Sequence, residues 1–290
     1  MRLCFALLVC VVPAVAAAQD KAATVKYVLT LRDPTTGAYR VTPDGKPSLR
    51  ACTGAVKALH YLGAKVPEPE KTAKFVLSCY DPQTGAFAEP GGKPDVAITS
   101  VGVMAAVDLG IPKEKYAKAM DYLKATAKTF EEVRIGAAAL EALNEKPEWV
   151  TEWFKIADDA FLTSPFKSDK QGRARMLGGF IAMKLRLGVP AAARRQESKL
   201  ILDIISNGQR DDGGFGDAKA EASDLGSTYR VMRALHLLKE KPRDAAALRK
   251  FVASCRNKDG GYGVTPDATS SMSGVYYAAI VSKWLDEMEK

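Results

Sequence analysis

The stretch QRDDGGFG, residues 209–216, decides the fold because a second copy of it follows closely. NKDGGYG occupies residues 257–263, and the glycine pairs of the two turns stand 47 residues apart. Two related turns occur earlier, in YVLTLRDPTTGAY from Tyr27 and in FVLSCYDPQTGAF from Phe75. Turns repeated at this spacing indicate a chain of similar supersecondary units, each burying its apolar face against its neighbours.

Each turn precedes a helix that is rich in small residues, and a more charged helix then leads to the next turn. A Ser or Asp opens the small-residue helices, where its side-chain oxygen can accept the first free N–H groups. The small-residue helices are expected at 48–63, 95–110, 131–144, 172–188, 224–238 and 270–285, and charged ones at 113–128 and 243–255. The predicted N-caps are Ser48, Asp95, Asp224 and Ser270.

The arrangement of these helices predicts the fold class. Small residues on several sides of a helix indicate close packing on those sides. The charged helices instead have one apolar stripe and one solvent-exposed face. Six helical hairpins, with the small-residue helices inside and the charged helices outside, close into a double ring. We therefore expect an all-α protein, an α/α toroid around a central cavity.

The repeated turn is predicted to have a mainly structural role, which we call a staple because the turn fits between neighbouring outer helices. Gly213-Gly214 and Gly260-Gly261 supply backbone angles that other residues resist. Phe215 and Tyr262 are expected to fill the gap between neighbouring outer helices.

The first residues are predicted to be a secretory signal. Arg2 is followed by an apolar run over 3–12 and by small residues that end in Ala18. The run is shorter than the roughly 20 residues that a membrane span needs, and no longer run follows. We therefore expect residues 1–18 to be removed near Ala18, residues 19–290 to form one toroid domain, and the protein to be exported without a stable membrane span.

Cysteine and histidine are scarce in the chain after Ala18. Cys52, Cys79 and Cys255 remain, there is no C-x-x-C pair, and the two histidines are His60 and His236, so a structural zinc site has few ligands. Cys79 and Cys255 end the similar stretches FVLSC and FVASC. They are interpreted as buried core residues, with a disulfide between them as the alternative.

The net charge of +8 is spread along the chain. The densest cluster is not interleaved with aromatic residues, so no nucleic-acid partner is expected, and a solvated face or attraction to an anionic surface or polymer is predicted. This cluster comprises Arg173, Arg175, Lys184, Arg186, Arg194 and Arg195.

Q-x-x-DGGF/Y-G turns at a period near fifty, each before a capped small-residue helix, resemble the prenyltransferase and squalene-cyclase repeat. The stretch 209–281 is most similar to protein prenyltransferase β subunits, such as that of geranylgeranyl transferase type II. The resemblance covers nearly the whole chain after Ala18, and it implies an α/α toroid whose central funnel is the substrate site.

Compared residue by residue, the resemblance does not extend to the zinc ligands of the family. Asp224 matches the family's zinc-binding Asp, but Gly226 stands where the ligand Cys belongs and Ser273 where the His belongs. The expected basic residues before Asp224 are reduced to Lys219, out of register. No cofactor is therefore expected, and Asp224 is interpreted as a plain N-cap. The D-x-D-D acid of terpene cyclases is also unmatched, because KIADDAF has Ile156 at the first position.

Large polar residues in the small-residue helices are the candidate ligand contacts. Guanidinium groups beside aromatic rings suit an anionic or sugar-like ligand with some apolar surface. The alternative is that each arginine pairs with a carboxylate such as Glu131, Glu132 or Asp224, or points to solvent. The candidates are Arg50, Arg134, Arg175, Asp224, Tyr229, Arg230, Tyr276 and Tyr277.

Several functions remain open at this point. The first hypothesis is an exported, divergent member of the family that binds a small-molecule, lipid or glycan ligand, or a partner protein, without zinc-dependent transfer. The second is an enzyme, either a protein-prenyltransferase-like transferase or a carbohydrate-active toroid acting on an anionic polymer. A scaffold that binds through its outer helices is the third.

Overall fold

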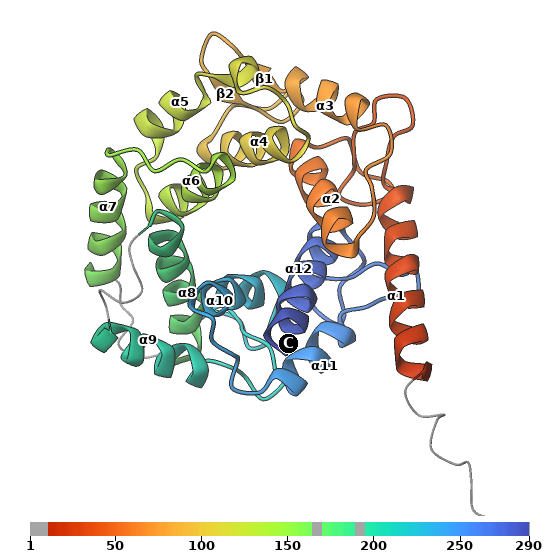
Figure 1. The fold of residues 1–290 in the computed structure, drawn as a ribbon, viewed down its shortest axis with the longest axis vertical. Helices are drawn as coiled ribbons and strands as arrows, with labels where there is room; N and C mark the ends of the chain where they lie inside the picture. Colours follow the sequence, from red (N-terminus) through yellow and green to blue (C-terminus); the bar gives the residue numbers. More distant parts are fainter. Residues whose placement is uncertain (1–10, 164–169, 189–194, 290) are drawn as a thin grey trace, which may run out of the picture.

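A computed structural model of the chain describes residues 11–163, 170–188 and 195–289. Its helices form two concentric rings (Figure 1). The inner helices are α2 (Leu49–Leu62), α4 (Val96–Asp108), α6 (Phe130–Leu143), α8 (Lys170–Arg186), α10 (Leu225–Leu238) and α12 (Met272–Met288). The outer helices are α1 (Val11–Thr30), α3 (Pro69–Ser78), α5 (Ala119–Thr126), α7 (Val150–Thr163), α9 (Arg195–Asn207) and α11 (Ala245–Ser254).

Outer and inner helices alternate along the chain, which gives six hairpins in the described residues. Each inner helix packs against the next, and α12 packs against α2, so the inner ring is closed. Helix α1 packs against both α2 and α12, where the first and last hairpins meet. The prediction of an all-α toroid is therefore confirmed. The short strands β1 (Tyr80–Asp81) and β2 (Ala86–Phe87) pair within one connecting turn.

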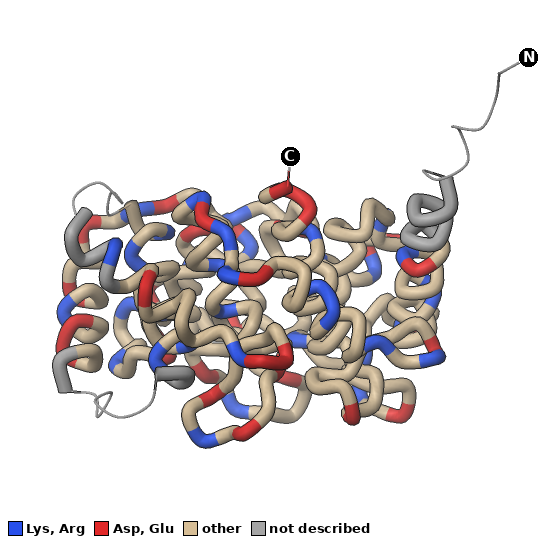
Figure 2. Tube along the Cα trace, turned by 90° about the horizontal axis from the view of Figure 1, so that it is seen from below, with Lys and Arg blue, Asp and Glu red and all other residues tan. Residues whose placement is uncertain are grey.

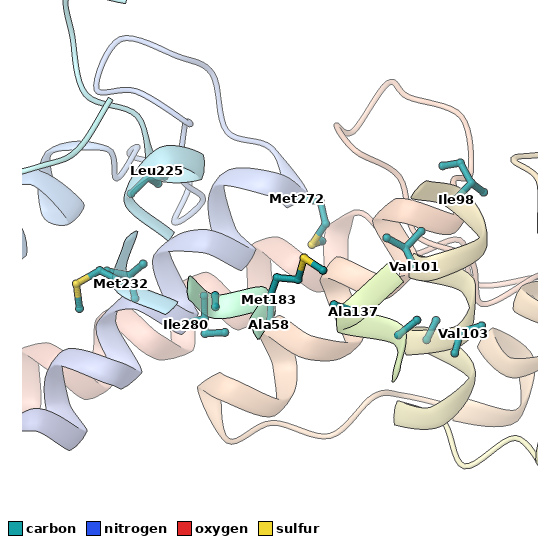
Figure 3. Packing of buried hydrophobic residues seen from close by; sticks show 14 of the residues in the cluster. Ala58, Ile98, Val101, Val103, Ala137, Met183, Leu225, Met232, Met272 and Ile280 are labelled. Atoms are coloured by element: carbon teal, nitrogen blue, oxygen red, sulfur yellow. The ribbon is translucent and has the colours of Figure 1, made fainter. Parts of the chain in front are cut away.

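Small residues on the inner helices let large outer residues pack between the rings. At Gly136 of α6, an added Cβ would come within 2.5 Å of the indole of Trp153, which α7 contributes and which is 2% exposed. At Gly102 of α4, it would come within 2.4 Å of Phe87. Figure 3 shows buried residues of the inner helices, including the small Ala58 and Ala137 and the larger Met183 and Met232.

The glycine turns act as staples because each lies directly against the next outer helix. Gly213 and Gly260 have φ values of 89° and 86°, in the left-handed region that favours glycine. An added Cβ would meet the backbone of Ala247 in α11 at 2.3 Å, or of Ala23 in α1 at 2.7 Å. The second glycine of each pair has no positive φ. It is needed because a side chain there would collide with neighbouring atoms. The staple interpretation therefore holds, with a positive φ at only one glycine of each pair.

Aspartate fixes the two turns in the same way. Asp212 accepts the N–H of Gly214 at 2.9 Å and the hydroxyl of Ser223 at 2.7 Å. Asp259 accepts the N–H of Gly261 at 2.9 Å and the hydroxyl of Ser270 at 2.7 Å. Of the two aromatic residues that were expected to fill gaps, Phe215 is fully buried and Tyr262 is half-buried.

The role of Ser270 in the turn corrects one predicted N-cap. Ser48, Asp95 and Asp224 cap their helices as expected. The cap of α12 is Ser271, whose hydroxyl accepts the N–H of Gly274 at 3.2 Å. Ser270 is unavailable because its hydroxyl is held by Asp259. The predicted helix 113–128 is also divided, into a 3₁₀ turn (Lys113–Tyr116) and α5.

Part of the basic cluster is buried, so the prediction of a wholly solvated face is wrong. Lys184 is 3% exposed and Arg186 is 7% exposed. Lys184 forms an ion pair with Asp158 of α7, and its ammonium lies 4.5 Å from the centre of the Phe180 ring. Arg194 and the side chain of Arg195 lie outside the described residues. Figure 2, an edge-on view of the ring, shows basic and acidic residues intermixed along the chain.

The cysteines are core residues, as expected. Cys52, Cys79 and Cys255 are free and buried, so there is no Cys79–Cys255 disulfide. Burial raises the pKa of the Cys52 thiol to about 12. The predicted signal falls on residues 1–10, which lie outside the described residues, and on the start of α1, where only the backbone is described. No helix in the described parts of the chain is long and apolar enough to cross a membrane.

Candidate functional site: a cationic central cavity

The inner helices enclose a cavity of about 490 Å³ at the centre of the ring. The eight candidates from the sequence all line it, and so do Gly226 and Ser273. The structure thus brings together residues of α2, α6, α8, α10 and α12. These lining candidates are Arg50, Arg134, Arg175, Asp224, Tyr229, Arg230, Tyr276 and Tyr277.

Charged residues lie at two levels of the cavity wall. Each inner helix is followed by an outer helix that returns the chain, so all inner helices run in the same direction across the ring. Residues in their first two turns therefore share one mouth, which we call the N-terminal rim: Arg50, Arg134, Arg175 and Arg230. Residues in their second halves form the C-terminal rim: Lys57, Asp108, Glu141, Arg186 and Arg233.

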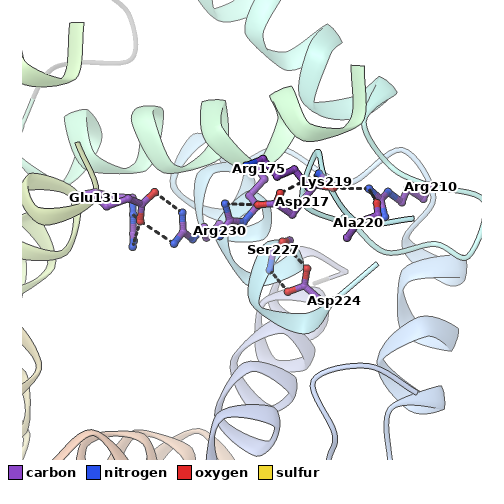
Figure 4. Close-up of polar contacts among 10 residues, drawn as sticks. Glu131, Arg175, Arg210, Asp217, Lys219, Ala220, Asp224, Ser227 and Arg230 are labelled. Carbon is purple, nitrogen blue, oxygen red and sulfur yellow. Dashed lines mark hydrogen bonds and ion pairs between the residues drawn. The ribbon is translucent and has the colours of Figure 1, made fainter. Parts of the chain in front are cut away.

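Glu131 joins two arginines of the N-terminal rim (Figure 4). Both guanidinium Nη atoms of Arg230 donate to its carboxylate, at 2.7 and 2.8 Å. Nε and Nη2 of Arg134 donate to the same carboxylate at 3.1 and 3.0 Å. Partial desolvation raises the pKa of Glu131, but the hydrogen bonds and charges of Arg230 and Arg134 outweigh it and bring this pKa down to about 2.

Two glycines of α8 make this bridge fit. Helix α8 lies between α6 and α10 in the inner ring (Figure 1). An added Cβ at Gly178 would come within 2.9 Å of the α10 backbone at Val231, and one at Gly179 within 3.0 Å of Arg134 Cδ. The bridge therefore depends on the absence of side chains at these two positions.

The other arginines of this rim differ in their partners. Arg175 pairs with Asp217 at 2.9 Å, and Arg210 holds that loop by donating to the Asp217 carbonyl at 2.9 Å (Figure 4). The Arg50 side chain is exposed and forms no ion pair within the described part of the chain. The alternative interpretation named pairing with a carboxylate or exposure to solvent: three of the four arginines are paired, and Arg50 is exposed. Of the expected partners, Glu131 is used, but Glu132 caps α6 instead.

The C-terminal rim is organised around another glutamate of α6. Arg186 Nε lies 3.0 Å from Glu141 Oε2, and Arg233 Nη1 lies 3.9 Å from Glu141 Oε1. Lys57 pairs with Asp108 at 2.7 Å. This rim was not predicted from the sequence, because only large polar residues early in each small-residue helix stood out as candidates. The spacing of Arg230 and Arg233 could have revealed it, since residues three apart share one face of a helix.

Aromatic rings connect the two rims. The ring of Tyr229 lies 5.2 Å from that of Tyr277, 5.6 Å from that of Tyr276 and 5.7 Å from that of Trp284, measured between centroids. Arg233 lies 4.9 Å from the centre of the Trp284 ring. Burial raises the pKa values of Tyr276 and Tyr277.

Tyr229 responds differently because it is beside the C-terminal cations. Burial alone would raise its pKa, but the charges of Arg233 and Arg186 outweigh burial and hold the pKa of Tyr229 below its ordinary value. The hydroxyl groups of Tyr229 and Tyr276 lie 3.4 Å apart, and the hydrogen bond between them acts in the same direction.

The residues around Asp224 do not fit a zinc ion. Its carboxylate accepts the N–H of Ser227 at 2.8 Å and the Ser227 hydroxyl at 2.6 Å, so it serves as an N-cap. A Cβ at Gly226 would stand 3.1 Å from this carboxylate, but glycine offers no ligand atom. Among the described residues, no three His, Cys, Asp or Glu side chains are grouped as a metal site would need.

The cavity wall is strongly cationic. Seven basic side chains line it against three carboxylates, and each carboxylate is already engaged by a cation or by a helix N-terminus. Such a wall favours an anionic group, and guanidinium groups bind carboxylate or phosphate through two parallel hydrogen bonds. The basic residues are Arg50, Lys57, Arg134, Arg175, Arg186, Arg230 and Arg233.

Comparison with known structures finds the same fold in a cyclase. The type II terpene cyclase MstE from Scytonema, in complex with geranylgeranyl dihydroxybenzoate, aligns with a TM-score of 0.63 and 12% identity over 96% of this chain and 99% of that chain. An apo variant of MstE gives a TM-score of 0.62 at the same identity and coverage. These identities indicate a shared fold alone.

The sequence comparisons identify a family but no individual related protein. No curated protein sequence matches this chain. The family model for the prenyltransferase alpha-alpha toroid domain matches residues 2–133 and 138–290. Together with the closed double ring of helices, this match shows that the chain belongs to the prenyltransferase alpha-alpha toroid family.

Proposed function

We propose that this protein binds an amphiphilic ligand with an acidic head group in its central cavity, without zinc-dependent prenyl transfer. The observation that carries the proposal is the N-terminal rim, where Arg134 and Arg230 together hold the carboxylate of Glu131. A carboxylate or phosphate of a ligand would find the same donors, together with Arg50, which forms no ion pair among the described residues.

The lining between the two rims suits an apolar chain. Val101, Met104, Ile135 and Met272 line the cavity together with the tyrosines. Ligand sites typically combine an apolar lining with a few placed polar groups, at volumes of roughly 300–1,000 Å³. That MstE binds geranylgeranyl dihydroxybenzoate supports an isoprenoid or other long-chain acid as the ligand class.

The alternatives are less well supported. A prenyltransferase-like enzyme needs a zinc site, and the donors around Asp224 do not provide one. A carbohydrate-active enzyme needs two available carboxyl groups that flank the substrate. Asp108 and Glu141 are the lining carboxylates of the C-terminal rim, and both are engaged by cations. A scaffold would not need an open cavity of about 490 Å³.

The test is calorimetric titration of the protein from residue 19 with decanoate and, separately, with uncharged decanol. We expect decanoate to bind at least about tenfold more tightly, as one charge-assisted hydrogen bond predicts. Arg230→Met should reduce this preference. Arg249→Met, which changes a cation of the outer helix α11, should retain it. Equal affinity for the acid and the alcohol, or no binding of either, would contradict the proposal.

We also propose that the protein is exported and processed near Ala18. The sequence of residues 1–18 supports this, and so does the position of the residues of α1 that help to close the ring. Thr24, Tyr27 and Val28 are buried and all follow Ala18, so cleavage there would leave them in place. N-terminal sequencing of the protein from its host should begin near Gln19, and recovery from the cytoplasm with residues 1–18 intact would contradict export.

A further inference from the structure

The C-terminal rim repeats the construction of the N-terminal rim at the other end of the cavity. Helix α6 supplies a glutamate to each rim, and each glutamate is shared by two arginines. Glu131 is shared by Arg134 and Arg230, and Glu141 is shared by Arg186 and Arg233. We call each glutamate together with its two arginines a clamp. The proposed function needs only one of these two clamps.

The second clamp retains capacity for a further anion. Arg233 reaches Glu141 only at 3.9 Å, and its buried Nε has no hydrogen-bond acceptor among the described residues. Arg186 is 7% exposed, yet it lines the cavity. A buried guanidinium group that faces a cavity with unused donors is costly unless an acceptor reaches it.

The charge of this rim is also positive. Lys57, Arg186 and Arg233 stand against Asp108 and Glu141. The lowered pKa of Tyr229 is consistent with this excess, because Arg233 and Arg186 stabilise a phenolate there. An acidic group that enters between Tyr229 and Arg233 would meet the same favourable potential.

The spacing of the two rims limits the length of a ligand that can reach both. Arg50 and Lys57 are seven residues apart on α2, and Arg134 and Glu141 are seven residues apart on α6. At 1.5 Å per residue, the rims are separated by roughly 10 Å along α2 and α6, whereas on α10 Arg230 and Arg233 are only about 4.5 Å apart along the helix. A medium-length chain would span them.

We propose that the C-terminal rim is a second anion-binding site and that the ligand is a long-chain compound with an acidic group at each end. This inference rests on the proposed function, which assigns the first acidic group to the N-terminal rim. The second group would bind Arg233 and Arg186 and displace Glu141 from them.

The experiment compares decanedioate with decanoate in calorimetric titrations of the protein from residue 19. The second charged hydrogen bond should make the diacid bind roughly tenfold or more tightly. Hexanedioate, which is too short to span the roughly 10 Å between the rims along α2 and α6, should show a smaller gain. If decanoate binds and decanedioate binds no better, the second site is refuted and the proposed function stands. If neither binds, both fail.

Two variants assign the effect to this rim. Arg233→Met keeps an apolar side chain beside Trp284 but removes the charge, and it should abolish the advantage of the diacid over decanoate. Glu141→Gln removes the competing carboxylate and should increase that advantage severalfold, which provides a test even if Arg233→Met folds poorly. An advantage that is the same in both variants as in the unmodified protein would overturn the assignment.

Discussion

Arg230 of α10 donates both Nη atoms to the carboxylate of Glu131 on α6, at 2.7 and 2.8 Å, past the intervening helix α8. This bridge links two inner helices that are not neighbours in the ring. It also occupies the donors that the proposed ligand would use, so the same contact bears on both stability and binding.

The first prediction concerns acid stability. The pKa of Glu131 is lowered in the folded protein to about 2 from 4.5. Its ion pairs therefore contribute stability that is fully present above pH 4.5 and is lost as the pH falls towards 2. In chemical denaturation at several pH values, Glu131→Gln should lose less stability over this window than the unmodified protein. Glu240→Gln, at an exposed position, should behave like the unmodified protein.

A second prediction concerns the staple glycines. Both Gly213 and Gly63 have positive φ values, 89° and 76°, so alanine at either should cost about 1–2 kcal/mol of backbone strain. Only at Gly213 would the new Cβ also collide with α11, at 2.3 Å from Ala247. Gly213→Ala should therefore lose about 1–3 kcal/mol more stability than Gly63→Ala. Equal losses in thermal unfolding would show that the turn does not act as a staple.

The third prediction concerns Tyr229. Arg233 and Arg186 lower its pKa, so a phenolate absorbance near 295 nm should appear at a lower pH than for an ordinary tyrosine. Tyr229→Phe should remove this first step, and Arg233→Met should move it to higher pH. A single titration step with an ordinary tyrosine pKa would contradict the electrostatics described for the C-terminal rim.

A fourth prediction separates the two members of the Lys184–Asp158 ion pair. Lys184 is buried between Phe180 and Asp158, whereas the Asp158 side chain is 48% exposed. Asp158→Asn leaves the buried ammonium unpaired and should cost about 1–3 kcal/mol, whereas Lys184→Met removes the charge and should be nearly neutral. Denaturant midpoints of the two variants provide the comparison, and a larger loss in Lys184→Met would show that the charge itself stabilises the fold.

The fold could be predicted from the sequence because its signal is repeated. The glycine turns recur, and small residues cover several sides of each inner helix, so the toroid and most of its caps follow from local chemistry. Ser270 was misassigned because the choice between it and Ser271 depends on Asp259, which the turn brings near.

The site could be predicted only in part. Arg50, Arg134, Arg175 and Arg230 were found because a large cation is unusual early in a small-residue helix. Their partners were harder to find, since Glu131 and Arg230 are 99 residues apart and meet only when the ring closes. Arg186 was assigned to the surface because burial of a charged residue depends on a tertiary partner, here Glu141.

The most direct test of the central claim is native mass spectrometry with metal analysis on the processed protein purified from its own host. The account predicts a chain without stoichiometric zinc that retains an acidic, long-chain ligand, and that loses this ligand when both Arg134 and Arg230 are replaced by Met. One zinc ion per chain, or a retained ligand without any acidic group, would contradict it.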